Sequence, residues 1–104
     1  MDIIKIRENL ETLPDEIEKA QIEYEKADAQ YDYLKRLKDH LLAVWAERHL
    51  GTNAERQRKA TASTGYLTHL KGIHAAAEER GKKRAKYERL KNTFEAMRSL
   101  NKNV

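Results

Sequence analysis

The sequence predicts an all-α protein, an antiparallel hairpin of two long amphipathic helices with a short connecting helix. Charged residues make up 37% of the 104 residues, and only one Pro and four Gly interrupt the chain. Apolar residues recur at helical spacing over long stretches. This composition is typical of long helices with narrow apolar seams, and the length predicts a single helical domain over residues 1–104. Because a hairpin leaves apolar surface outside, two copies could close into a dimeric four-helix bundle.

The first long helix is expected from about residue 14 to residue 50. Pro14 is tolerated in a first turn, because its missing N–H would have no intrahelical partner there. Residues 3–10 form either a separate short helix or the start of the long one, and the sequence leaves both open. Gly51 is expected just past the C-terminus of this helix.

An apolar seam runs along this first helix at alternating spacings of three and four residues. If Pro14 only kinks the chain, Glu8, Leu10 and Leu13 extend the seam backwards. Its main members are Ile17, Ala20, Tyr24, Ala27, Tyr31 and Leu34, followed by Leu37, Leu41, Val44 and Trp45.

A short connecting helix is expected over 53–62, because Thr52 with Glu55 three residues later is a capping-box pattern. The following Thr- and Ser-rich stretch to Gly65 has weak helix propensity and predicts a break. A second long helix then spans about 66–100, with continuity through Gly72 and Gly81 left open. Its expected seam is Leu67, Leu70, Ile73, Ala76 or Ala77, Tyr87, Leu90, Phe94 and Met97.

The composition excludes several classes of protein. There is no Cys, which rules out disulfides, thiolate metal sites and cysteine nucleophiles. The longest fully apolar run, residues 41–46, is far too short to span a membrane. The N-terminus lacks the basic and apolar regions of a signal peptide, so a cytoplasmic protein is expected.

No enzyme or cofactor site is predicted. Phosphate-binding glycine loops and a nucleophile elbow are missing from the sequence. None of the four His residues is spaced i,i+4 from another, and His74 with Glu78 is a pair too common to predict a metal site. We therefore expect no catalytic residue, no metal and no cofactor.

Charge is unevenly distributed along the chain. Residues 1–50 carry 8 Lys or Arg and 12 Asp or Glu, whereas residues 51–104 carry 13 and 5, so the halves have net charges of −4 and +8. Either the two halves pack against each other, or the second half contacts nucleic acid or an acidic partner. The candidate binding residues are Arg56, Arg58 and Lys59 in the connecting helix, and Lys82, Lys83, Arg84, Lys86 and Arg89, with Lys91, in the second long helix.

Three aromatic residues are candidates for an interface. Tyr33 lies off the apolar seam, which makes it the aromatic residue most suited to partner contact. Trp45 fits either a core position or an interface anchor, and Tyr66 is the third candidate. Tyr24 and Tyr31, by contrast, lie on the seam and are expected in the core.

Most of the chain resembles the small helical coiled-coil proteins encoded in bacteriophage early regions, near recombination and replication genes. The features that carry this resemblance are the Leu-Pro-Asp-Glu-Ile-Glu segment, the Asn-Ala-Glu-Arg-Gln-Arg-Lys-Ala segment at 53–60 and the Lys-Tyr-Glu-Arg-Leu-Lys segment at 86–91. Gly72 and Gly81 depart from the usual pattern. The resemblance implies a phage accessory role without a defined activity.

These observations lead to three hypotheses of function. The first is a non-catalytic helical module that contacts nucleic acid or a nucleoprotein complex. The second is a protein–protein inhibitor or adaptor, such as a phage anti-defence protein, that binds a host or phage protein through its acidic or basic half. The third is a structural coiled coil that associates with itself as a homodimer.

Overall fold

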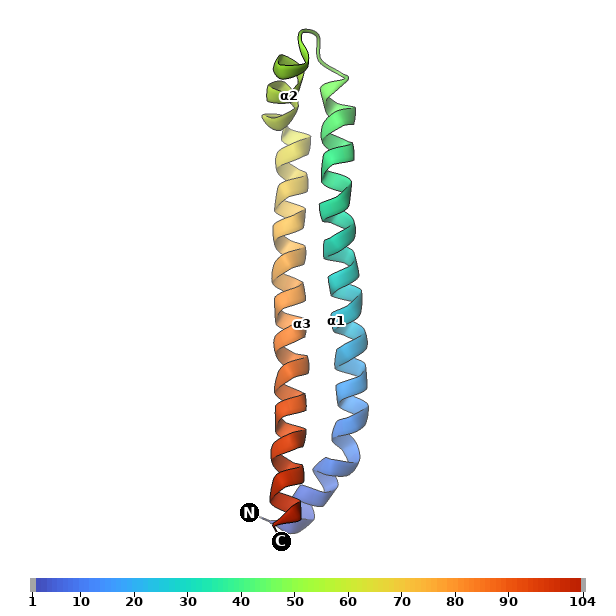
Figure 1. The fold of residues 1–104 in the computed structure, drawn as a ribbon, viewed down its shortest axis with the longest axis vertical. Coiled ribbons are helices and arrows are strands. Elements are labelled where there is room, and N and C mark those ends of the chain that lie inside the picture. Colours follow the sequence, from blue (N-terminus) through green and yellow to red (C-terminus); the bar gives the residue numbers. More distant parts are fainter. Residues whose placement is uncertain (1, 104) are drawn as a thin grey trace. The chain divides into compact units, whose positions relative to one another are not determined.

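A computed structural model describes residues 2–103, and these form three α-helices (Figure 1). Helix α1 spans Ile3–Ala46, α2 spans Asn53–Thr61 and α3 spans Thr64–Lys102. The described residues form no strand. The prediction of an all-α chain with two long helices and a short one between them is therefore confirmed. Met1 and Val104, the ends of the predicted domain, lie outside the described residues.

Contacts divide the chain into two units, and each unit contains part of both long helices. Unit 1 combines residues 1–27 with residues 80–104, and unit 2 comprises residues 28–79. Within each unit the segments of α1 and α3 run antiparallel (Figure 1). The predicted antiparallel pairing of the two long helices is thus present in both units.

Helix α1 begins at Ile3 and continues through Pro14. Residues 3–10 are thus the start of the long helix, one of the two alternatives that the sequence left open, and the predicted bound near residue 14 is wrong. Asp2 is the actual N-terminal cap, since its Oδ1 accepts a hydrogen bond from the Ile4 amide at 2.9 Å. Proline inside a helix removes one backbone hydrogen bond and bends the axis, and the blue N-terminal part of α1 is bent in Figure 1. Burial of Ile6 and Leu13 helps to offset that cost.

The core of unit 1 is narrow and follows a seven-residue period along α1. Ile6, Leu13 and Ala20 are buried, whereas Glu8, predicted on this seam, is exposed. Across from this seam the Tyr87 ring of α3 stacks on Tyr24, with the ring centroids 6.2 Å apart. The remaining seam residues of α3 in this unit are half-buried, namely Leu90, Phe94 and Met97.

In unit 2, α1 ends at Ala46, earlier than the predicted residue 50, and the chain turns through Gly51. Gly51 has φ of +120°, a conformation that other residues rarely adopt. The predicted cap of α2 is confirmed, because Thr52 Oγ1 accepts from the Glu55 amide at 3.2 Å. The side chain of Ala60 on α2 is fully buried. This short helix is therefore packed against the rest of unit 2.

The break expected up to Gly65 is much shorter in the structure, because Ser63 joins α2 to α3. Its hydroxyl donates to the Ala60 carbonyl at 2.6 Å and accepts from the Tyr66 amide at 3.2 Å. Ser63 thus caps α3 at its N-terminus, and Gly65 lies inside the first turn. Helix α3 is then continuous through Gly72 and Gly81, the two positions at which the sequence left continuity open.

The predicted start of the α3 seam is wrong. Leu67 and Leu70 are 50% and 36% exposed, while Tyr66 and His69 are half-buried. Counting back from Ile73 by four and then three residues leads to His69 and Tyr66, the continuation of the alternating spacing. The His69 ring nitrogen Nε2 lies 2.9 Å from the Leu34 carbonyl oxygen on α1, a polar contact that hydrophobicity alone does not indicate.

Candidate nucleic-acid interface

The first basic cluster, Arg56, Arg58 and Lys59, lies on α2 and is called the α2 cluster. Thr52 fixes the start of this helix, and the positively charged Arg58 and Lys59 lie in its last turn, where the helix dipole favours cations. Both side chains are exposed, and neither forms an ion pair with any described carboxylate. Their charge is therefore available to an anionic partner.

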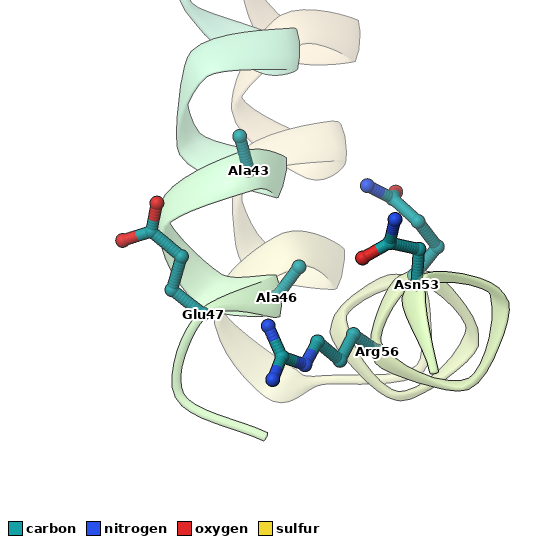
Figure 2. Close-up of a pocket in the computed structure, with 6 residues that line it drawn as sticks. Ala43, Ala46, Glu47, Asn53 and Arg56 are labelled. Atoms are coloured by element: carbon teal, nitrogen blue, oxygen red, sulfur yellow. The ribbon is translucent and has the colours of Figure 1, made fainter. Parts of the chain in front are cut away.

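Arg56 differs from the other two members, because it is half-buried on the side of α2 that faces α1. Figure 2 shows Asn53 and Arg56 extending from α2 toward Ala46, while the Glu47 carboxylate points away from the guanidinium. Together these residues border a small recess of about 250 Å³, which we call the notch. The notch is lined by Ala43, Ala46, Glu47, Asn53, Arg56 and Gln57.

The Nε of Arg56 is buried and has no hydrogen-bond partner in the part of the chain that the structure describes. A buried donor without a partner costs free energy, since it has lost its water without gaining an acceptor. A recess on the other side of α2 is lined by Arg58 and Lys59 with Glu55 and Ala62. The three cations that are close in sequence are thus divided between two sides of one short helix.

The second basic cluster, on the α3 segment of unit 1, is partly neutralised. Lys83 Nζ lies 3.3 Å from Glu23 Oε2 on α1, and Lys86 Nζ lies 3.8 Å from the same oxygen. The hydrogen bond and the positive charge of Lys83, with the charge of Lys86, lower the pKa of the Glu23 carboxyl. Arg84 Nε donates a hydrogen bond to Glu88 Oε1 at 3.1 Å, and this contact raises the pKa of the Arg84 guanidinium. Packing between the halves therefore explains the pairing of Lys83 and Lys86, whereas Arg84 is paired within α3 itself.

Lys91 of this cluster lies over the Tyr87 ring, 5.0 Å from its centroid. Lys82 and Arg89 have neither a carboxylate nor an aromatic partner among the described residues. Both are exposed, and neither lies within ion-pair distance of a described carboxylate. They are seven residues apart and so lie on the same face of α3. We call these two residues the α3 pair.

Of the three candidate interface aromatics, Tyr33 is 58% exposed. Trp45 and Tyr66 instead pack on each other inside unit 2, edge to face, with centroids 6.4 Å apart and an interplanar angle of 82°. The Trp45 ring also lies against Gly65. Trp45 and Tyr66 thus pack within unit 2, and Tyr33 is the candidate whose ring is exposed for contact with a partner.

Sequence reasoning missed the polar side chains that line the notch beside Arg56. Asn53 and Gln57 offer amide groups, and Ala43 and Ala46 leave the space between the helices unfilled. Their role depends on where α2 packs against α1, and no local pattern in the sequence contains that information.

The described residues contain no group of three side chains placed to hold a metal ion. His74 and Glu78 contact each other at 3.0 Å on an exposed part of α3. No helix among the described residues has the length and apolarity needed to cross a membrane. Comparisons with protein-family models, with curated proteins and with solved structures find no match to this chain.

Proposed function

We propose that the protein is a non-catalytic helical module that binds the phosphate backbone of a nucleic acid. The observation that carries this proposal is that Arg58 and Lys59 on α2, and Lys82 and Arg89 on α3, are exposed and have no carboxylate partner among the described residues. Unpaired cations of this kind release counterions when they meet phosphates, which supplies sequence-independent affinity. The sequence contains no DNA-reading module, so we propose contact with the backbone rather than readout of bases.

The test is a binding titration of the purified protein with labelled single- and double-stranded DNA and RNA at low and at moderate salt. We expect affinity that falls steeply with salt, and a weaker salt dependence in the double variant Arg58→Gln/Lys59→Gln. The matched control is Arg36→Gln/Arg98→Gln, which removes the same charge from two cations already paired with Asp32 and Glu95. Absence of binding at low salt, or equal losses in both double variants, would refute the proposal.

A second candidate function is binding of a protein, either a second copy or an unrelated partner. Leu67 and Leu70 on α3 and Tyr33 on α1 leave large apolar surfaces exposed in unit 2. A partner's helix that packs on these residues would remove their apolar surface from water. The mass of the protein in solution tests the homodimer, and Leu67→Gln/Leu70→Gln should convert a dimer to a monomer without loss of helix content.

The adaptor or inhibitor alternative makes a different prediction. A monomer that binds no nucleic acid but retains a stoichiometric host or phage protein, and loses it on Tyr33→Ser, would favour that alternative. A phage accessory role is compatible with both candidates and stays a proposal that rests on the resemblance of segments such as 53–60.

A further inference from the structure

The notch between α1 and α2 has the chemistry of a phosphate site. Its α2 side presents the guanidinium of Arg56 with the side-chain amides of Asn53 and Gln57. Each of these groups can donate hydrogen bonds, and a guanidinium binds phosphate oxygens in a planar, bidentate manner. The opposite side is formed by Ala43 and Ala46, whose small side chains leave room for a group of that size.

Arg56 is prepared for an anion in a way that the other two cations of the α2 cluster are not. It is half-buried, whereas Arg58 and Lys59 are exposed. Its Nε is out of contact with water and has no acceptor within the described chain. Because Nε is enclosed by protein atoms, the guanidinium is partly desolvated, and its terminal amino groups are the donors that an anion in the notch would meet.

The carboxylate of Glu47, the one acidic group that lines the notch, does not neutralise Arg56. No ion pair joins the two, and Figure 2 shows the Glu47 carboxylate directed away from the guanidinium. The notch thus presents one cation, Arg56, that no described carboxylate neutralises, which suits the single negative charge of one phosphodiester.

We infer that the notch is the primary phosphate contact of the α2 cluster, holding one backbone phosphate between Arg56, Asn53 and Gln57. Arg58 and Lys59, on the other side of α2, then add exposed positive charge that attracts the same backbone, while Arg56 holds a phosphate in the notch. This inference rests on the proposed function for its ligand, a nucleic-acid phosphodiester. It assigns unequal roles to Arg56 and Arg58, two cations that sequence alone treats as equivalent.

The test uses three single variants of the full chain and one labelled oligonucleotide. Arg56→Gln removes the donor, Ala43→Leu fills the notch without changing charge, and Arg58→Gln is the matched control for charge. Loss of a charged hydrogen bond predicts about tenfold weaker binding for Arg56→Gln. We expect a comparable loss for Ala43→Leu and a clearly smaller one for Arg58→Gln, with helix content and unfolding midpoint checked for each variant.

A second measurement reports on the notch without nucleic acid. Titration with inorganic phosphate should shift the Nε–Hε nuclear magnetic resonance signal of Arg56 and leave that of Arg58 in place, and Ala43→Leu should abolish the shift. Equal losses for Arg56→Gln and Arg58→Gln, with no effect of Ala43→Leu, would overturn the notch while leaving the proposed function standing. A shift of the Arg56 signal in a protein that binds no oligonucleotide would support the notch as a phosphate site and refute the proposed function.

Discussion

Glu23 on α1 and Lys83 on α3 form an ion pair, with Oε2 and Nζ 3.3 Å apart, that joins the two helices of unit 1. Because the pKa of Glu23 is lowered, the folded chain holds this carboxyl in its ionised form more strongly than the unfolded chain does. The resulting stabilisation is present at pH values above the unfolded pKa and is lost as pH falls through the folded pKa.

The first prediction follows from the lowered pKa of Glu23, which stabilises the folded chain at neutral pH. Glu23→Gln should lower the free energy of unfolding at neutral pH, and the difference from the unmodified protein should shrink in acid. Glu18→Gln, an exposed change on the same helix, serves as the control, because it removes a carboxylate that has no ion-pair partner among the described residues. Urea unfolding at neutral and at acidic pH measures both, and a constant difference for Glu23→Gln across this range would contradict the prediction.

The second prediction concerns two glycines in the middle of α3. A Cβ at Gly72 or Gly81 would meet nothing within 4 Å, so neither position needs glycine for packing within the chain. Gly72→Ala and Gly81→Ala should therefore each stabilise the protein by up to about 1 kcal/mol, the difference in helix propensity. Chemical denaturation checks this, and a loss of stability at Gly72 would mean that another helix approaches there.

The third prediction concerns Gly51, where replacement by alanine should lower the stability instead of raising it. Its positive φ lies in a region where a Cβ is strained, so Gly51→Ala should destabilise the fold by about 1–2 kcal/mol. The same denaturation experiment measures it. An unchanged midpoint would show that the turn between α1 and α2 relaxes to another conformation.

Much of the helical architecture could be predicted from local signals. The cap formed by Thr52 and Glu55 marks α2 correctly, and the alternating spacing of apolar residues marks both long helices. Pro14 led to the wrong start of α1, because proline is common in the first turn of a helix. In the structure Asp2 is the cap, and the helix that follows it already buries Ile6. Propensity alone does not reveal that such burial can offset an internal proline.

The candidate site was less predictable, because it depends on how helices pair rather than on how each one forms. Lys82, Lys83 and Lys86 are lysines of the same basic segment, yet only Lys83 and Lys86 contact Glu23. Leu67 was expected on the seam, although the half-buried position belongs to Tyr66. Both distinctions require the register of α3 against α1, which a single sequence does not specify for seams of mixed polarity.

The fourth prediction concerns Trp45 and Gly65. A Cβ at Gly65 would lie 3.1 Å from Cζ2 of the Trp45 ring, closer than ordinary contact. Gly65→Ala should therefore displace the ring and gain less stability than Gly72→Ala, although alanine is the better helix former in both places. Because the chain has one Trp, its fluorescence reports the displacement directly. An unchanged spectrum together with a full gain of stability would show that the ring packs elsewhere in solution.

The last prediction tests the packing of α2 through its buried alanine. Ala60 is fully buried, so Ala60→Leu must force α2 away from its neighbours, at a cost of about 1–3 kcal/mol for overpacking. Ala54→Leu, an exposed change on the same helix, should have little effect on stability. Hydrogen exchange of the α2 amides should accelerate in Ala60→Leu alone, because the helix then loses the contacts that hold it against unit 2. Equal exchange rates in the two variants would mean that α2 is held by its Thr52 cap rather than by packing, and that the notch beside Arg56 lacks a fixed shape.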